Sequence, residues 1–176
     1  MPTTLEIPLN KSKILLLILL SLLIGVGGMW FVFGQYSFQL TLFGFPINMK
    51  ILGSIVAIFF GACTILLFKK YQDKKPGLII DTGGLTDNSS AVSAGFIPWD
   101  DIESIHMLTL NRQDFIQIKV SNPQDYIDQQ KSSFKRKLMQ LNQSTYGSPI
   151  NITANTLKIS SEELFAIIKE HLEQQK

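Results

Sequence analysis

The chain has 176 residues and a formal net charge of +2, but its charge is divided unevenly. Residues 1–75 carry seven lysines against two carboxylates, whereas residues 76–176 carry nine basic and twelve acidic side chains. The acidic second region excludes nucleic acid as an expected partner, because neutralising phosphates needs clustered Lys and Arg. The single cysteine, Cys63, lies in an apolar run, so nothing indicates a disulfide scaffold.

Two apolar runs without charge lie in the first region. Residues 14–33 form a run of 20 and residues 51–68 a run of 18. A helix of about 20 residues covers the roughly 30 Å hydrocarbon core of a bilayer. The first run exceeds the ~7–15 apolar residues of a signal peptide, and a second run follows soon after. We therefore expect residues 1–75 to form a membrane anchor with transmembrane helices at 14–33 and 51–68.

Lysine placement predicts the orientation of this anchor. The connecting segment 34–50 contains one lysine, Lys50, and the other six flank the runs on their outer sides: Lys11, Lys13, Lys69, Lys70, Lys74 and Lys75. Positive charge is retained on the cytoplasmic side of membrane proteins. The pattern predicts a multi-pass protein of the cell (inner) membrane with cytoplasmic N- and C-termini.

Small residues recur every four positions in the second run, at Gly53, Ala57 and Gly61. Ser21 and Gly25 have the same spacing in the first run. Small residues let helix backbones approach closely inside a membrane. This spacing predicts a helix-packing face, which serves either a hairpin of the two spans or self-association through the transmembrane helices.

From Pro76 onward the pattern predicts an α+β cytoplasmic domain, residues 76–176. Short apolar runs alternate with turn residues as far as residue 101. Residues 102–110 are mostly apolar, and apolar and polar residues alternate over 116–120. The polar turn between them, at 111–114, makes an antiparallel hairpin the clearest element of the domain.

Helices are expected in the last third of the chain. Pro123–Leu141 has apolar residues in a polar background and is predicted to form two helical pieces broken near Ser132–Ser133. A short strand is expected at 150–152. Ser160 and Glu163 have the spacing of a capping box. They precede a predicted helix whose apolar stripe is formed by Leu164, Phe165, Ile168 and Leu172.

Candidates for chemistry are few, and we expect no catalytic residue, cofactor or metal site. The two histidines, His106 and His171, have no cysteine partner for zinc. The carboxylates at Asp100, Asp101 and Glu103 lack the ligand spacing of a calcium loop and are interpreted as solvated. Trp99 is interpreted as a core residue.

One basic cluster stands out in the second region: Lys131, Lys135, Arg136 and Lys137, interleaved with Phe134 and Leu138. Such a mixture suits a helix lying on anionic lipid headgroups. The alternative is an ordinary solvated helix face that packs Phe134 and Leu138 inward. These four cations are the candidate anionic-lipid contact.

A strand meander closed by a C-terminal helix is the outline of a pleckstrin-homology (PH)-like domain. Residues 84–88 and 95–102 resemble a family of small bacterial membrane proteins of unknown function, and 122–126 and 146–150 look like further marks of it. The resemblance implies a transmembrane helical hairpin followed by a PH-like antiparallel sheet domain with a C-terminal capping helix. It implies no catalytic residues, and the helical stretch before the last strand departs from the usual outline.

The expected function is that of a membrane-tethered, non-enzymatic binding or adaptor protein, which presents a PH-like domain at the inner membrane surface. Its partners would be membrane lipids or a protein. Two alternatives stay open on the sequence: an immunity or inhibitor protein acting at the membrane, and a lipid-directed enzyme with an unrecognised active site.

Overall fold

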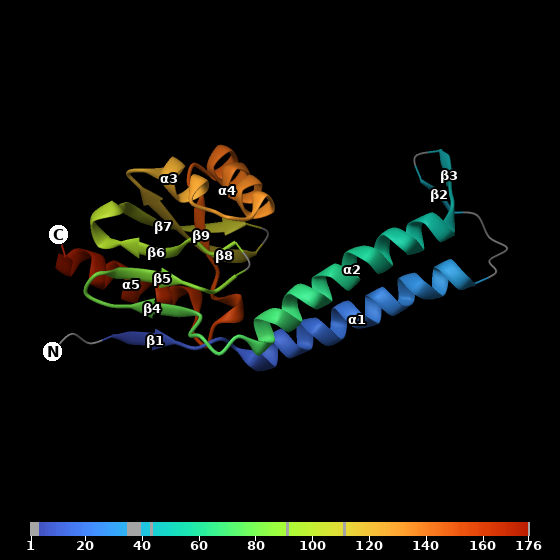
Figure 1. The fold of residues 1–176 in the computed structure, drawn as a ribbon, viewed down its shortest axis with the longest axis horizontal. Helices are drawn as coiled ribbons and strands as arrows, with labels where there is room; N and C mark the ends of the chain where they lie inside the picture. Colours follow the sequence, from blue (N-terminus) through green and yellow to red (C-terminus); the bar gives the residue numbers. More distant parts are fainter. Residues whose placement is uncertain (1–3, 35–39, 43, 91, 111, 176) are drawn as a thin grey trace. The chain divides into compact units, whose positions relative to one another are not determined.

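The chain divides into two units in a computed structural model that describes residues 4–34, 40–42, 44–90, 92–110 and 112–175 (Figure 1). Lys11–Asp73 forms a helical unit. The globular unit combines Lys74–Lys176 with the N-terminal segment that ends at Asn10. This division differs from the expected one, which assigned residues 1–75 to the anchor and began the domain at 76.

Strand pairing explains the difference. Strand β1 (Leu5–Ile7) runs antiparallel to β4 (Leu78–Ile80), with Leu5 opposite Ile80. The backbone of Asn10 also donates to the carbonyl of Thr156 at 2.7 Å. The N-terminal segment therefore completes a sheet whose other strands follow the helical unit.

The helical unit contains two helices that are long and apolar enough to cross a membrane, α1 (Lys11–Phe33) and α2 (Met49–Gln72). The expected spans 14–33 and 51–68 lie within them. A short hairpin of β2 (Leu40–Leu42) and β3 (Phe45–Ile47) lies between the helices in sequence. The Asn48 side chain begins α2 by accepting the backbone N–H of Lys50 at 3.0 Å, one of the bonds that helix starts need.

The two helices pack as a hairpin on their small residues. A Cβ atom added at Gly53 would lie 2.6 Å from the carbonyl oxygen of Gly28, and one at Gly28 would lie 2.8 Å from the backbone nitrogen of Ala57. Only glycine permits these approaches. A Cβ at Gly61 would meet nothing within 4 Å. The contact thus uses Gly53 and Ala57 of the expected face, and Gly28 opposite them.

Polar contacts join the helices at two further levels. The hydroxyls of Ser21 and Thr64 lie 2.8 Å apart. The Lys11 ammonium donates to the carbonyl oxygens of Tyr71 and Asp73 at the end of α2. A cation there donates hydrogen bonds to carbonyl groups that have no partner within the helix, and its charge interacts favourably with the negative end of the helix dipole. Lys11 therefore ties the start of α1 to the end of α2.

The globular unit is α+β, as predicted, and holds two antiparallel sheets. One has the order β1-β4-β5-β6, with β5 at Gly84–Asp87 and β6 at Gly95–Pro98. The other has the order β7-β8-β9, with bounds Ile102–Leu110, Gln113–Val120 and Ile150–Ile152. The expected hairpin and the expected strand at 150–152 are confirmed. Fully buried side chains come from both sheets: Leu78, Ile80, Leu85, Ile97, Ile118 and Ile152.

Three helices accompany the sheets: α3 (Pro123–Asp128), α4 (Ser133–Tyr146) and α5 (Ser161–Gln175). The predicted break near Ser132 is confirmed, since its hydroxyl accepts the N–H of Lys135 at 3.4 Å and begins α4. Helix α4 continues past the expected end at Leu141 and stops at Gly147, which adopts a left-handed φ of 77°.

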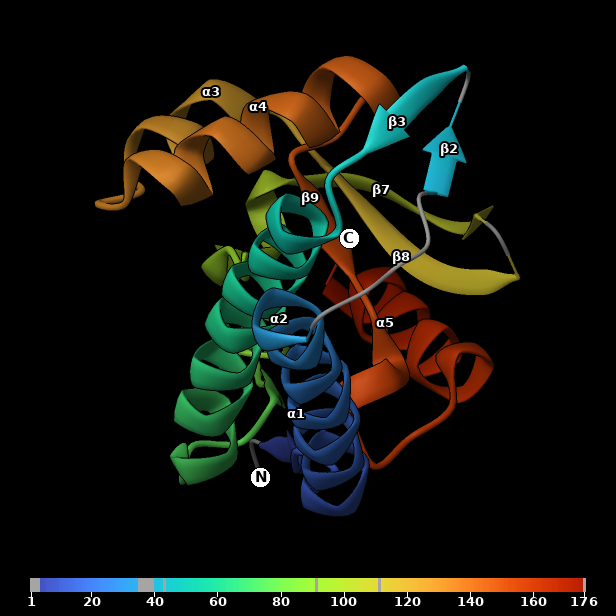
Figure 2. The same ribbon diagram turned by 90° about the vertical axis from the view of Figure 1, so that its right-hand side faces the viewer.

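Helices α4 and α5 lie on opposite faces of the β7-β8-β9 sheet (Figures 1 and 2). Successive side chains of a strand point to opposite faces. Gln117 points toward α4, where its amide donates to the carbonyl of Tyr146 at 2.8 Å. Its neighbours Ile116 and Ile118 therefore point to the α5 side, and both are buried.

Candidate functional site

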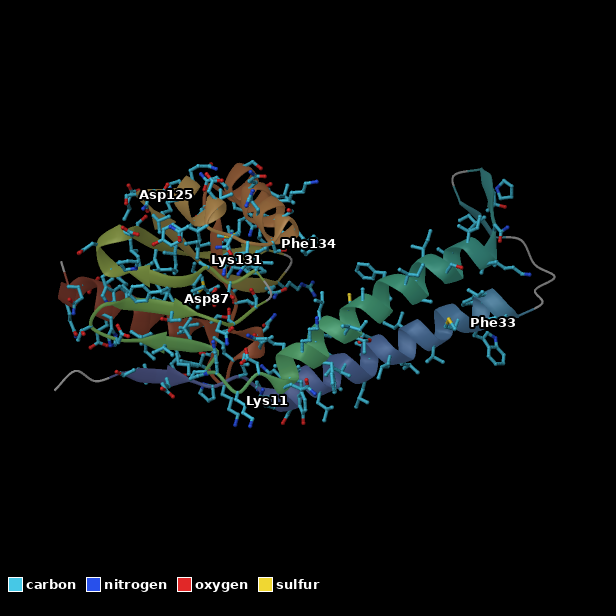
Figure 3. The ribbon with its side chains drawn as sticks, in the orientation of Figure 1. Lys11, Phe33, Asp87, Asp125, Lys131 and Phe134 are labelled. Carbon is cyan, nitrogen blue, oxygen red and sulfur yellow. The ribbon has the colours of Figure 1, made fainter. Side chains whose placement is uncertain are left out.

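The outer face of α4 carries exposed apolar side chains. Phe134, labelled in Figure 3, is 67% exposed and Leu141 is 58% exposed, whereas Met139 of the same helix is fully buried. Leu138 is half-buried. The structure therefore does not pack Phe134 inward, as the solvated-face alternative required. Two large apolar groups seven positions apart share one exposed helix face.

The four cations of the basic cluster have different environments. Lys131 and Lys137 are exposed, with Lys137 between Phe134 and Leu141 on the outer face. Arg136 donates to the carbonyl oxygen of Gln130 at 3.0 Å, and Lys135 is half-buried. Helix α4 contains no carboxylate. The result is a surface, here called the α4 face, formed by Phe134, Lys137 and Leu141 of the helix and by exposed Lys131, two residues before its start.

One carboxylate of the acidic cluster, Asp101, serves the fold. Asp101 accepts a hydrogen bond from the Tyr126 hydroxyl at 2.6 Å, which joins the start of β7 to α3. Burial raises the pKa of Tyr126 above its usual value, and the hydrogen bond and negative charge of Asp101 raise it further. Within the described parts of the chain, no three His, Cys, Asp or Glu side chains gather closely enough to hold a metal ion.

Trp99 is a core residue, as interpreted from the sequence. It is 5% exposed, and its indole donates to the carbonyl oxygen of Asp81 at 2.8 Å. The His171 ring stacks on it, with centroids 6.3 Å apart and planes at 18°. His106 is exposed on β7, and its ring nitrogen lies 3.0 Å from the hydroxyl of Ser104. The two histidines are therefore not brought together.

The sequence patterns did not predict the groove that lies between β7 and α5. It has a volume of about 380 Å³ and is lined by Ile105, Phe165, Lys169, Leu172 and Glu173. The sequence analysis predicted Phe165 in the apolar stripe of α5. In the structure the buried stripe consists of Leu164, Ile168 and Leu172, and Phe165 is half-buried. The sequence does hold one sign of this groove. Leu164 and Phe165 are adjacent, so the apolar face of α5 is wider than a single buried stripe.

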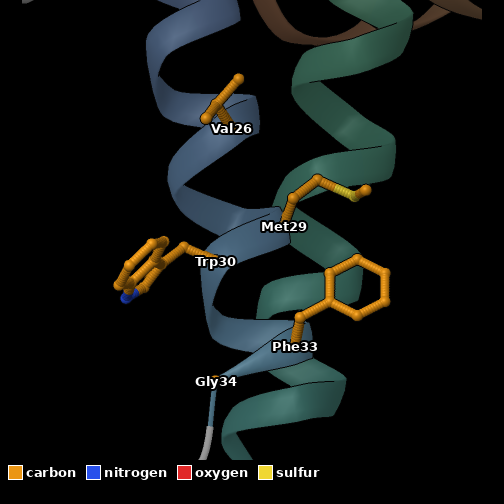
Figure 4. Close-up of a pocket in the computed structure, with 5 residues that line it drawn as sticks. All are labelled: Val26, Met29, Trp30, Phe33 and Gly34. Atoms are coloured by element: carbon orange, nitrogen blue, oxygen red, sulfur yellow. The ribbon is translucent and has the colours of Figure 1, made fainter.

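A second hollow lies along α1 in the helical unit and is lined by Val26, Met29, Trp30, Phe33 and Gly34 (Figure 4). Four of the five residues belong to the end of one apolar helix, α1, and Gly34 follows it directly. None of these five described residues has a charged side chain that could orient a ligand, and in a bilayer acyl chains would fill the hollow.

Comparisons of the chain with protein-family models, curated proteins and solved structures find no match. Function is therefore assigned from the two surfaces described above. The α4 face combines exposed apolar groups with cations, and the groove lies on the other side of the same sheet.

Proposed function

We propose that this chain is a membrane-tethered, non-enzymatic binding protein whose globular unit works at the cytoplasmic surface of the cell membrane. The α4 face would contact anionic headgroups there. The observation that carries the proposal is the exposure of Phe134 and Leu141 beside Lys131 and Lys137. Apolar side chains flanked by lysines are the pattern of a helix that lies in the membrane interface.

The orientation rests on charge and on chain connectivity. Because β1 and β4 pair in one sheet, the flank before α1 and the flank after α2 belong on the same side of a membrane. Six of the seven lysines in residues 1–75 lie at this end of the two helices, in the first turn of α1, in the last turn of α2 or just after it. Positive flanks are cytoplasmic, so the globular unit and both termini are assigned to the cytoplasm.

The tether lets a weak surface contact suffice. Asn10 is followed directly by Lys11 of α1, and Asp73 is followed directly by Lys74 of the globular unit. Each lysine near an anionic surface contributes about 1 kcal/mol. Lys131 and Lys137 together would then contribute about 2 kcal/mol. A contact of this size is effective because the unit never leaves the surface.

The fold also supports the PH-like assignment. A four-stranded and a three-stranded antiparallel sheet, closed by the C-terminal helix α5, match the PH-like outline. Two departures distinguish this chain: the apolar helices follow the first strand, and α3 and α4 stand between β8 and β9. The resemblance to two-span bacterial proteins of unknown function agrees with this arrangement and adds no chemistry.

The test measures how close α4 lies to the bilayer in the intact chain. A fluorophore is attached at Gln140→Cys, an exposed site beside Leu141, in a Cys63→Ser background. The protein is placed in nanodiscs that contain headgroup-quenching lipid. We expect strong quenching in anionic discs, reduced by salt and by Lys131→Gln with Lys137→Gln.

The control is Lys158→Gln with Lys169→Gln, which removes the same charge from exposed sites outside α4. It should leave the quenching unchanged. Equal quenching in anionic and zwitterionic discs, or equal loss in both double variants, would refute the lipid contact.

A further inference from the structure

Helix α4 is held to the globular unit by little apolar burial. The structure describes all fourteen of its residues, and Met139 alone among them is buried. The large apolar side chains of Phe134 and Leu141 are exposed instead. A surface helix of a globular protein normally turns its apolar stripe toward the core. Because α4 does the reverse, the hydrophobic effect contributes little to its position on the sheet.

The sheet, for its part, does not keep its core on the α4 side. The buried isoleucines of β8 and β9 share the face toward α5: Ile116, Ile118, Ile150 and Ile152. The face toward α4 carries amides, with Gln117 of β8 opposite Asn151 of β9. Lys119, two residues after Gln117 and on the same face, is exposed. A movement of α4 away from this face would therefore leave the isoleucine core closed.

Two buried oxygens weaken the contact further. The side-chain oxygens of Gln143 on α4 and Asn151 on β9 are buried, and neither accepts a hydrogen bond within the described part of the chain. Gln143 lies one turn after Met139, on the same side of the helix. A buried acceptor without a donor carries a desolvation cost, which exposure to water removes. The bond from the Gln117 amide to the Tyr146 carbonyl, at 2.8 Å, opposes the separation.

The chain after α4 is built as a pivot. Gly147 ends the helix with a left-handed φ of 77°, a conformation that favours glycine. The next residue, Ser148, is buried, and its hydroxyl donates to the carbonyl of Ile118 on β8. A change of backbone angle at Gly147 can therefore move α4 while Ser148 keeps β9 in place.

The chain before α4 is anchored in the same way. Gln130 is buried, and its amide donates to the carbonyl of Tyr126 in α3 at 2.9 Å. Only Lys131 and Ser132 separate this anchor from the helix, and two extended residues reach about 7 Å. Arg136 of α4 donates to the Gln130 carbonyl at 3.0 Å, so this bond would break when the helix moves.

We infer that α4 is a releasable helix, which separates from the sheet and pivots at Gly147 when it binds an anionic bilayer. The inference rests on the proposed lipid contact and describes how that contact is made. Release frees Arg136 from Gln130 and brings half-buried Lys135 within reach of headgroups, in addition to Lys131 and Lys137. An anionic surface therefore binds the released helix more tightly than the docked one. This difference in affinity is what shifts a conformational equilibrium.

The experiment measures the distance between α4 and α5, which lie on opposite faces of the sheet. Spin labels are attached at Gln140→Cys and Glu170→Cys, both exposed, in the Cys63→Ser background of the full chain in nanodiscs. We expect one distance in zwitterionic discs and a second, longer distance in anionic discs. The control pair, Lys158→Cys with Glu170→Cys, has no site on α4 and should give the same distance in both kinds of disc.

Two substitutions at the contact should shift the ratio of released to docked helix in opposite directions. Gln117→Ala removes the bond to Tyr146 and should raise the ratio about fivefold, as expected for one net hydrogen bond. Gln143→Met replaces the acceptor that has no donor by apolar atoms and should lower the ratio by a similar factor. Ser144→Met adds the same side chain at an exposed position and should leave the ratio unchanged. Each variant should unfold cooperatively on heating, like the parent.

The outcomes separate this inference from the proposed function. A single, unchanged distance in anionic discs, together with strong lipid quenching at Gln140, would overturn release and leave the lipid contact standing. Loss of the quenching itself would refute the proposed function, and the inference with it. Equal populations of the longer distance in both kinds of disc would show that anionic lipid does not drive the movement. Equal effects of Gln143→Met and Ser144→Met would also contradict the inference, because the contact with the sheet would then not control release.

Discussion

Ile7 lies opposite Leu78 in the pairing of β1 with β4, although α1 and α2 separate the two residues along the chain. Ile7 is 4% exposed and Leu78 is completely buried. Leu9, just before α1, is also buried and bridges to Leu157. The apolar helices are thus inserted after the first strand of the globular unit, and that unit is incomplete without residues 4–10.

The first prediction follows from this insertion. A fragment of residues 76–176 should be less stable than a fusion of residues 1–10, through a short Gly/Ser linker, to residues 74–176. Both would be compared by urea unfolding. In the fusion, Ile7→Ala should cost about 2–4 kcal/mol through the cavity that it leaves. Exposed Glu6→Ala should change stability by less than ~0.5 kcal/mol. Equal stability of the two proteins would contradict the role of β1.

Topology gives the second prediction. A reporter that is active only outside the cytoplasm should be silent when fused after Lys176 or before Met1. The pairing of β1 with β4 requires both ends on one side of a membrane, and the lysines at the ends of α1 and α2 favour the cytoplasmic side. Replacing Lys69, Lys70, Lys74 and Lys75 by Gln should raise the signal by weakening the charge bias. A fusion within segment 34–50 serves as the positive control. Activity at one terminus and silence at the other would be incompatible with the structure.

The third prediction concerns the closing helix. Leu164→Ala or Ile168→Ala should each destabilise the fusion protein by about 2–5 kcal/mol, since both side chains are fully buried. Ser160→Ala should cost about 1 kcal/mol, because the Ser160 hydroxyl accepts the N–H of Glu163 at 3.1 Å. Gln174→Ala, at an exposed position, is the control in the same urea titrations.

The packing of α1 against α2 gives the fourth prediction. Ser21→Cys and Thr64→Cys in the Cys63→Ser background should form a disulfide under mild oxidation, because the native hydroxyls lie 2.8 Å apart. Gly53→Leu should lower the yield sharply, since its Cβ would meet the Gly28 carbonyl. Gly61→Leu places the same side chain where a Cβ meets nothing within 4 Å, so the yield should persist. An equal loss of disulfide yield in both variants would show that α1 and α2 do not pack at Gly53.

Tyr126 gives the fifth prediction, on alkaline stability. Its pKa in the folded protein lies above the value of about 10 expected in the unfolded chain. The stabilisation from the protonated phenol is therefore complete below pH 10 and declines as pH rises above it. Tyr126→Phe should cost about 1 kcal/mol at pH 7 by removing the bond to Asp101. The variant should also lose less stability than the parent between pH 9 and 11, measured by urea unfolding. If the free energy of unfolding falls equally with pH in the variant and the parent, the titration of Tyr126 is not linked to unfolding.

Much of the fold could be predicted because its signals are local. The two apolar helices follow from runs without charge, the β7–β8 hairpin from alternation around a polar turn, and the start of α5 from Ser160 and Glu163. Each of these patterns depends on residues close together in the chain, where helix and strand periods can be recognised. For the same reason the break between α3 and α4 was evident at Ser132.

Tertiary structure alone decided the remaining features, because they depend on contacts between residues distant in sequence. Three residues, Leu5–Ile7, are too few to show a strand period, and their pairing partner lies beyond both apolar helices. The pattern around Phe134 was compatible with either face of α4, and burial of Met139 against the sheet turned Phe134 outward. The groove exists because β7 ends its sheet and α5 leaves Ile105 half-covered. Sequence periodicity specifies which side chains share a face of an element, but only packing determines what that face meets.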